Sequence, residues 1–530
     1  MSSRAGHAKQ VFLNTLAGLC GSAGTAIIGL ALTPFLIYSL GFEAYGFWIV
    51  LSTVVNYVGL ADFGLESTFI KYTAEYAATK QHERVRQVTT FGVVFYVTLS
   101  LLMAPLALVL APYLVFWMKV SPHLAVQGPL LFAWIIVAYF LQSAAGVLGS
   151  VLAGTGSLRL VSLTTFISRL GYAAAAIVLC LRGFGVFGLL IATFVQIAIA
   201  AILCYCLARK RVGVVFISPL RIERGVMKKL FKLGGWIQLT NLASTVTMET
   251  NRLIISIFVQ TSAVTLFEVA NRLTRTVRSF PFSFLIALLP AVSAIDATQN
   301  DEKVFNRVYV RATRYLNLST VLLLGFVIGA AEPITRAWLG HAYPALFGMI
   351  VVLGLGYIVS NISQVGTTML RATGLPKYEA FLTILSAAAG IATMFLFVPR
   401  FGTLGVAMSM LFGSISGTVY FLWMFHRLRK LSVMAGFFSW YGRLVICGGA
   451  ATLSILWALP SIHTDLFASR AGAILAVIID GILYLAVFTG ALLITRFFSE
   501  NDSAGLKRLL PPRVQSLLSR RVKDDAPAPA

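Results

Sequence analysis

The sequence predicts an all-α integral membrane protein with about fourteen transmembrane helices, and three observations support this class. Of 530 residues, 58% are hydrophobic and only 12% are charged, and the mean hydropathy is +0.86. Segments long enough to cross a bilayer core of about 30 Å recur from Val11 to Phe498. These segments are rich in Leu, Ala, Gly and Phe and do not alternate in polarity, which favours helices over barrel strands.

The first six expected spans follow a polar start, MSSRAGHAKQ. The apolar run after it is too long for the core of a signal peptide, so we expect the first span to be retained. A cytoplasmic N-terminus (1–11) then precedes a first six-helix bundle (12–208). Its spans are expected near residues 12–40, 45–64, 89–111, 128–153, 160–181 and 186–208.

A basic cytoplasmic linker (209–233) leads to a second six-helix bundle (234–425). Its spans are expected near residues 234–259, 264–294, 312–338, 345–370, 379–398 and 403–425. The segment LAGTGSLRL, which begins at Leu152, returns in this bundle as LRATGLPKY, which begins at Leu370. The turn RGFGVFG likewise returns as PRFGTLG. Since six spans bring the chain back to the same side, the repeat is parallel, and we expect a central cavity between the two halves.

Two further spans, near 443–461 and 471–495, lie outside the repeat and form two extra transmembrane helices (443–495). They are followed by a cytoplasmic tail (496–530) that ends in DDAPAPA. We expect a short amphipathic helix on the membrane surface around Leu506–Val522.

The formal net charge of +23 is distributed unevenly along the chain. The expected external loops contain only Lys119, Arg182, Arg336, Arg400 and Arg470 out of 42 lysines and arginines. This asymmetry predicts that both termini lie in the cytoplasm, in a multi-pass protein of the cell inner (plasma) membrane. The basic stretch 208–232 suits anionic lipid headgroups, and with this hydropathy we expect no nucleic-acid partner.

Motifs for catalysis or cofactor binding are missing from the sequence. There is no Walker loop, no nucleophile elbow and no cluster with metal-ligand spacing. The five cysteines all lie in apolar runs. We therefore expect a protein that is not an enzyme and that uses no cofactor and no metal.

Polar residues within the seventh and eighth expected spans are the best pointers to function, because ionisable groups in lipid are costly unless they face a cavity or a partner. At 100° per residue, one face of the seventh span gathers a polar stripe. Its members are Gln238, Asn241, Thr245, Glu249, Arg252 and Ser256. The eighth span carries a cationic stripe. Its members are Glu268, Asn271, Arg272, Arg275 and Arg278.

The register of these two spans predicts ion pairs between them. Helical rise brings the segment from Glu249 to Arg252 to the depth of the segment from Glu268 to Arg272, so two acids and two arginines can pair. Arg275 and Arg278 have no evident acid, and Arg169 in the fifth span adds positive charge. Such an excess suits a diphosphate. Structural ion pairing, or snorkelling of Arg169 and Arg278 to the headgroups, is the alternative.

Weaker candidates complete the set. Asn361 and Gln364 in the tenth span fit a cavity lining. Glu249, Glu268 and Asp62 are candidates for ion coupling, although the two glutamates can be engaged by arginines and Asp62 can cap the helix that follows it.

Several motifs carry a family resemblance. The stretch 33–76 contains Tyr45-Gly46 and the run Asp62-Phe63-Gly64-Leu65, and FEVANRL and LRATGLPKY follow later. Over roughly residues 11–430 the chain resembles Wzx-type polysaccharide flippases, the polysaccharide-transporter branch of the MATE-like (MOP) superfamily. It departs where Asn251 and Leu266-Phe267-Glu268 stand in place of the Asp and the Gly-x-Tyr that are common in the family.

The resemblance implies that the chain flips undecaprenyl-diphosphate-linked oligosaccharide from the cytoplasmic to the periplasmic leaflet, for O-antigen, capsule or exopolysaccharide synthesis. It also implies ion-coupled alternating access, and a polysaccharide polymerase and glycosyltransferases as partners. The alternatives are a MATE-type exporter of drugs or other small molecules, a flippase of the peptidoglycan lipid precursor, and a scaffold for polysaccharide synthesis.

Overall fold

The structure is a computed structural model that describes residues 2–63, 65–118, 120–213, 216–219, 222–298, 302–372, 375, 377–428, 434–462 and 469–497. Every regular element in these ranges is a helix, which confirms the all-α class. Ten of the described helices are long and apolar enough to cross a membrane. The total of fourteen spans stays a prediction. The tail helix expected at Leu506–Val522 lies outside the described residues.

The first two expected spans are contained in one long element, α1 (Ser2–Val58), which is broken at Gly41. Gly41 has φ 81° and ψ 166°, a conformation that glycine adopts at little steric cost, and it divides α1 into helical segments 2–40 and 42–58. A short 3₁₀ turn, η1 (Gly59–Asp62), and α2 (Leu65–Ala78) follow. The break lies between the first two expected spans, 12–40 and 45–64.

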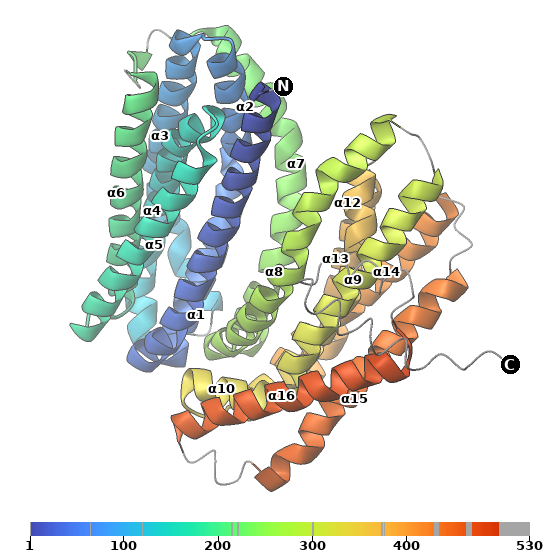
Figure 1. The fold of residues 1–530 in the computed structure, drawn as a ribbon. Coiled ribbons are helices and arrows are strands. Elements are labelled where there is room, and N and C mark those ends of the chain that lie inside the picture. The colour runs from blue at the N-terminus through green and yellow to red at the C-terminus, as the bar shows by residue number, and fades with distance from the viewer. Residues whose placement is uncertain are drawn as a thin grey trace, which may run out of the picture. The chain divides into compact units, whose positions relative to one another are not determined.

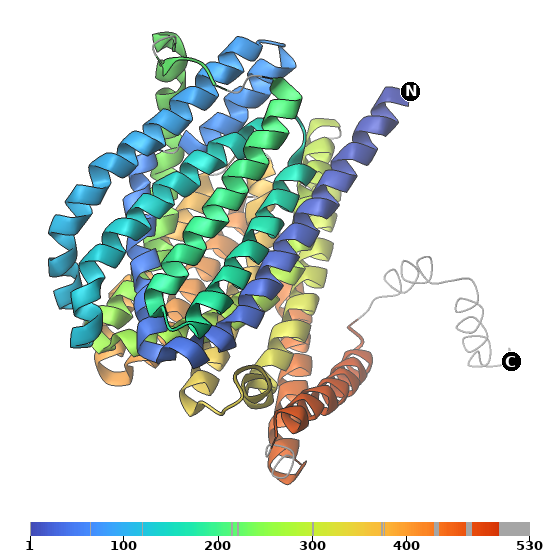
Figure 2. The same ribbon diagram turned by 90° about the vertical axis from the view of Figure 1, so that its left-hand side faces the viewer.

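The next four helices correspond to the third to sixth expected spans. They are α3 (His82–Trp117), α4 (Pro122–Gly154), α5 (Leu158–Leu181) and α6 (Gly185–Val212). In the chain, α3 packs on α4, α5 packs on α6, and α1 packs on α5 (Figures 1 and 2). Since α2 and α6 also pack on α4, helices α1 to α6 form one connected group.

The seventh and eighth expected spans form a hairpin. Helix α7 (Arg224–Ile254) ends in a π-helical turn, η3 (Ile255–Val259), and Gln260 is extended before α8 (Thr261–Thr298) begins. The later helices are α11 (Pro344–Ile362), α12 (Gln364–Ala372), α13 (Lys377–Phe401) and α14 (Thr403–Leu428). The tenth expected span thus comprises α11 and α12, with a break at Ser363.

The chain divides into two compact units, Met1–Ala294 with Tyr343–Leu422, and Ile295–Ala342 with Trp423–Ala530. The second contains α9 (Glu302–Gly329), α10 (Ala331–Leu339), α15 (Met434–Ile462) and α16 (Arg470–Ile494). The ninth span was expected to continue to 338, but α9 ends at Gly329. Pro333, in the first turn of α10, has no N–H to donate to the Gly329 carbonyl, which favours a break between the two helices.

The last two helices of the second unit are anchored on α9 and α10. Tyr484 donates its hydroxyl to the carbonyl of Val321 at 3.0 Å, and Thr452 donates to that of Gly325 at 3.1 Å. The guanidinium of Arg470 donates to the last carbonyls of α10, those of Ala337 and Trp338, at 2.9 Å each. A cation at a helix C-terminus satisfies carbonyls that have no partner within the helix.

The segments expected to repeat share local geometry. The Ser157 amide donates to the carbonyl of Leu152 at 2.9 Å, and the Leu375 amide donates to that of Leu370 at 2.8 Å. In the second pair of segments, Gly185 and Gly402 both have positive φ, 57° and 54°. The same contacts at matching positions support an internal duplication.

Candidate functional site

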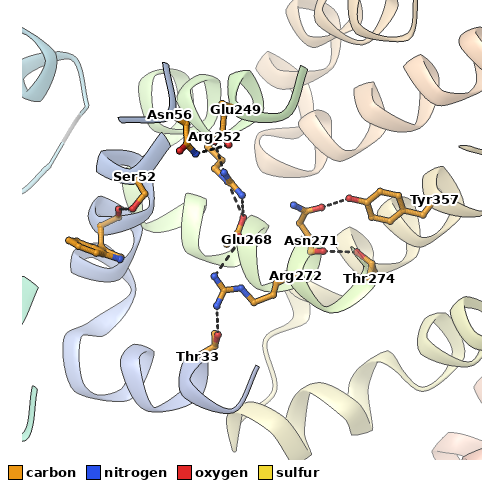
Figure 3. A network of polar contacts seen from close by, with 11 residues as sticks. Thr33, Ser52, Asn56, Glu249, Arg252, Glu268, Asn271, Arg272, Thr274 and Tyr357 are labelled. Atoms are coloured by element: carbon orange, nitrogen blue, oxygen red, sulfur yellow. Dashed lines mark hydrogen bonds and ion pairs between the residues drawn. The ribbon is translucent and has the colours of Figure 1, made fainter. Parts of the chain in front are cut away.

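A chain of ion pairs links α7 and α8 inside the first unit (Figure 3). Arg252 contacts the carboxylates of both Glu249 and Glu268, at 2.5 and 2.9 Å. The second oxygen of Glu268 lies 3.7 Å from Arg272. The pairing that the helix register predicts is therefore present, with two acids set against two arginines.

The α7–α8 hairpin explains this register. Arg252 precedes the turn at Gln260 by about the same number of residues as Glu268 follows it, so both lie at one depth. The start of α8 is fixed by side-chain hydrogen bonds to other segments. Thr261 donates to the carbonyl of Met118 at 2.5 Å, and Thr265 donates to that of Phe42 at 2.7 Å.

Helix α1 completes the network from the other side. Asn56 donates to Glu249 at 3.0 Å, and Arg272 donates to the hydroxyl of Thr33 at 2.7 Å. The side chains of Glu249 and Glu268 are only 12% and 4% exposed. Carboxylates this deeply buried are tolerable only when they are paired and hydrogen-bonded, and both conditions hold here.

A cavity of about 480 Å³ opens beside this network. Helices α1, α4, α5, α6, α7 and α8 all contribute to its wall. Its charged lining consists of Arg169, Arg252, Arg272 and Glu268. Aromatic and amide side chains make up much of the remainder, namely Tyr45, Trp48, Tyr139, Tyr172, Asn56, Gln142 and Gln196. Mixed aromatic and polar walls of this kind are typical of small-molecule sites.

Arg169 supplies the net positive charge of this cavity. Its Nη1 donates to Gln196 at 3.4 Å, and its guanidinium carbon lies 4.8 Å from the centre of the Tyr172 ring. Among the described residues it forms no ion pair. The two network glutamates offset only Arg252 and Arg272, so the charge of Arg169 remains available to an anion.

Arg278 belongs to a different cluster, between α8 and α11. Its Nε donates to Asn361 at 2.8 Å, and its guanidinium carbon lies 4.9 Å from the centre of the Tyr357 ring. The Tyr357 hydroxyl in turn donates to Asn271 at 2.6 Å. These partners are neutral, so they orient the guanidinium and leave its charge unbalanced.

The other predicted site residues have separate locations. Arg275 is exposed and makes no hydrogen bond or ion pair within the described part of the chain. Gln238 donates to the carbonyl of Leu60 at 2.5 Å, Thr245 and Gln364 are half-buried, and the side chain of Asn241 lies outside the described ones. Asp62 is buried at the end of η1, near Tyr96. The five of these residues whose side chains are described do not line the cavity.

Sequence reasoning missed the aromatic wall of the cavity. Tyr45, Trp48, Tyr139 and Tyr172 lie in apolar spans, where an aromatic side chain cannot be told from a lipid-facing one. Gln196 had a detectable signal, because an amide in the middle of a span is costly unless it faces a partner or a cavity. Among the described residues, no group of histidines, cysteines and acids could hold a metal ion.

The fold is that of solved multi-pass membrane transporters, two of which are similar over most of this chain. The lipid II flippase MurJ, in its inward closed conformation, matches with a TM-score of 0.67 at 15% identity, over 91% of this chain and 100% of that one. A MATE-family multidrug resistance transporter in its inward-facing conformation matches with a TM-score of 0.60 at 16% identity, over 79% and 96% of the two chains.

The chain belongs to the polysaccharide biosynthesis protein family, whose sequence pattern matches residues 39–347. The proposed O-antigen transporter of Shigella flexneri is 23% identical over 428 residues, which cover 79% of this chain and 98% of that protein. EpsK, an uncharacterized membrane protein of Bacillus subtilis, is 21% identical over 392 residues, 72% and 75% of the two chains. The resemblance to polysaccharide flippases inferred from the sequence is confirmed.

Proposed function

We propose that this chain flips undecaprenyl-diphosphate-linked oligosaccharide from the cytoplasmic to the periplasmic leaflet of the cell inner membrane, for O-antigen, capsule or exopolysaccharide synthesis. The observation that carries the proposal is the cavity with one unbalanced arginine, Arg169, beside aromatic and amide side chains. The family, and a relative named as a proposed O-antigen transporter, support the same substrate class.

Each part of such a substrate has a suitable partner in the cavity. Guanidinium groups give forked, permanently charged donors to phosphate oxygens, so Arg169, Arg252 and Arg272 suit the diphosphate. Amides donate and accept hydrogen bonds and therefore suit sugar hydroxyls. Aromatic rings such as that of Trp48 offer flat apolar surfaces to the C–H faces of sugars. The lipid tail stays in the bilayer while the polar head crosses.

In the proposed transport cycle, ion coupling arises because the two glutamates and the diphosphate compete for Arg252. This guanidinium is held by Glu249 and Glu268 together. If a proton neutralises either carboxylate, the attraction is weakened and Arg252 becomes available to the diphosphate. Loss of the proton restores the pair and displaces the anion. In this scheme Glu249 and Glu268 act as proton carriers, and Asp62, outside the network, is a separate candidate.

Alternating access would be a rocking of the halves 12–208 and 234–425, connected by the linker 209–233. Within the second half, Arg275 and Arg278 offer further positive charge along α8. The extra helices in 443–495 anchor α9 and α10, which we take as a structural role. The uneven distribution of lysine and arginine supports cytoplasmic placement of both termini.

Two alternatives remain transporters of the same fold. A MATE-type exporter of cationic drugs requires an acidic cavity, whereas this one is net positive. A flippase of the peptidoglycan precursor also needs cationic groups for a diphosphate, and its substrate differs in the glycan. In either flippase role the chain is not an enzyme, and the polymerase and glycosyltransferases of the pathway are its expected partners.

Transport in proteoliposomes tests the proposal. The purified chain should move a fluorescent undecaprenyl-diphosphate oligosaccharide between leaflets. Arg169→Gln, and the double variant of Arg275→Gln with Arg278→Gln, should lower the rate. Arg182→Gln is the matched control, since Arg182 is exposed in the turn between α5 and α6. Full transport by the Arg169 and the Arg275/Arg278 variants would refute the assignment of the arginines, and no transport by the wild-type chain would refute the function.

A further inference from the structure

A second cavity, of about 240 Å³, lies beside the first within the same unit. Helices α2, α4, α5 and α6 form its wall. Gln142 and Gln196 line both cavities, so this pair of amides stands where the two meet. Along α4, the lining runs from Gln142 to Ala153, which corresponds to about 16 Å of helical rise. The two cavities together are therefore elongated.

The direction of the second cavity follows from the ends of its helices. Ala153 lies in the last turn of α4, and Val161 lies in the first turn of α5. The second cavity thus leads from the arginines toward the α4–α5 turn, which is cytoplasmic in the proposed orientation.

The chemistry of this lining differs from that of the first cavity. Among the described residues it contains no lysine or arginine, and its one ionisable acid is Glu66. A diphosphate would be repelled by this carboxylate and would find no cation. The lining is therefore unsuited to the charged part of the substrate.

Four hydroxyl-bearing residues are part of the wall of the second cavity. Ser150, Thr164, Thr165 and Ser168 line it, and each donates its own proton to a carbonyl of its helix, at 2.7 to 3.0 Å. The Thr164 oxygen also accepts from the Cys204 thiol at 3.7 Å, and a hydroxyl oxygen has two lone pairs, so each of the four keeps at least one for a ligand. Apolar residues such as Ile70, Ala145 and Ala200 share the wall, so the cavity offers both hydrogen-bond acceptors and apolar surface, which suits the O–H groups and C–H faces of sugars.

The amides at the junction are available to a ligand. Gln142 makes no hydrogen bond within the described part of the chain, and its side chain is exposed to the cavities. Gln196 accepts one hydrogen bond from Arg169 and keeps its amide N–H groups free. Hydroxyl acceptors, free amides and small residues such as Gly146 together fit an uncharged polyol.

We propose that the second cavity is a subsite for the sugars of the glycan that lie beyond the first, with the diphosphate bound at Arg169 in the first cavity. This inference rests on the proposed function. The sugar nearest the diphosphate would pass the Gln142–Gln196 junction, and the following sugars would lie along α4 toward the α4–α5 turn.

Glycine substitutions test this arrangement. Gly146 lines the second cavity and a Cβ atom there would meet no atom within 4 Å, so the side chain of Gly146→Leu should extend into this cavity. Gly29 lines the first cavity and also faces open space. Gly449 in α15 belongs to neither cavity and again has nothing within 4 Å, which makes Gly449→Leu a matched control.

The assay compares two probes in proteoliposomes, undecaprenyl diphosphate bearing a single N-acetylglucosamine and the same lipid bearing a tetrasaccharide. Gly146→Leu should slow the tetrasaccharide lipid by about tenfold or more, the scale on which pocket shape discriminates ligands, and spare the single-sugar lipid. Gly29→Leu should slow both, and Gly449→Leu neither. Gly146→Ala, with only one added methyl group, should fold as the wild-type chain does and show a smaller effect of the same selectivity.

The outcomes separate the two proposals. If Gly146→Leu slows both lipids equally, or neither, while the wild-type chain moves both, the subsite is wrong and the function stands. If the wild-type chain moves neither lipid, the proposed function is wrong.

Discussion

Two nitrogens of Arg252, Nε and Nη2, donate to the same carboxylate oxygen of Glu268, at 3.0 and 2.9 Å, across the α7–α8 hairpin. Because the side chain of Glu268 is 4% exposed, this contact is a buried ion pair that holds both helices in one register. Breaking such a pair leaves an uncompensated charge, which is far costlier than losing a surface pair.

Glu268→Gln should therefore destabilise the protein by about 3 kcal/mol, because Arg272 loses its acid and Arg252 keeps only Glu249. The measurement is the free energy of unfolding in detergent. The partly exposed pair of Arg336 and Glu332, with side chains 28% and 44% exposed, is a control, and Glu332→Gln should cost less than about 1 kcal/mol. Equal losses for the two variants would contradict a buried role for Glu268.

Gly46, in the Tyr45-Gly46 motif, lies where α1 touches the start of α8. A Cβ atom there would collide with the carbonyl oxygen of Thr261 and crowd the hydroxyl of Thr265. Gly46→Ala should cost about 1–3 kcal/mol, as overpacking does. Gly29→Ala is the control in the same helix, since it faces open space and should be neutral or slightly stabilising. Thermal unfolding that ranks the two variants in the opposite order would exclude the close approach.

Trp48 lines the first cavity, where its ring can stack on a sugar. Trp48→Ala should slow transport of the glycan-bearing lipid by roughly fivefold, the equivalent of about 1 kcal/mol of aromatic contact. Trp457 in α15 is 87% exposed, so Trp457→Ala serves as the control and should leave the rate unchanged. The readout is the initial rate in proteoliposomes, and equal rates for both variants would remove Trp48 from the site.

Glu66, which lines the second cavity, makes the stability of the fold depend on pH. Desolvation and the negative charge of Asp62 raise the pKa of Glu66 above its ordinary value. A carboxyl whose pKa is higher in the folded than in the unfolded protein stabilises the fold at low pH, and this stability is lost as pH rises through the raised pKa. Tyr96 and Tyr139 are its other titratable neighbours.

Glu66→Gln should therefore unfold at a higher temperature than the wild-type chain at pH 8. The difference should shrink as pH falls toward about 4, near the unfolded carboxyl value. Thermal unfolding measured at several pH values checks this, and a difference that stays constant across the range would contradict a raised pKa of Glu66.

Most of the predictions made from the sequence depend only on the length of apolar segments and on helical geometry. Apolar length determines which segments can cross a bilayer, and helical rise alone brings Glu249, Arg252, Glu268 and Arg272 to one depth on either side of the turn at Gln260. The polar faces of the seventh and eighth spans follow from the same helical geometry. These predictions need no knowledge of what packs beside each helix.

Only the tertiary structure decided how the arginines and aromatic residues are grouped. It places Arg169 with Arg252 and Arg272 around one cavity, and Arg278 against Tyr357 and Asn361 of α11. The rotation of each helix about its axis depends on neighbours that are distant in sequence, and hydropathy does not encode it. The second cavity could not be predicted from the sequence for the same reason, because residues of four different helices form its wall. The sequence by itself thus determined that the chain is a membrane transporter with arginines on its seventh and eighth spans. The packing of the helices determined which residues share a site.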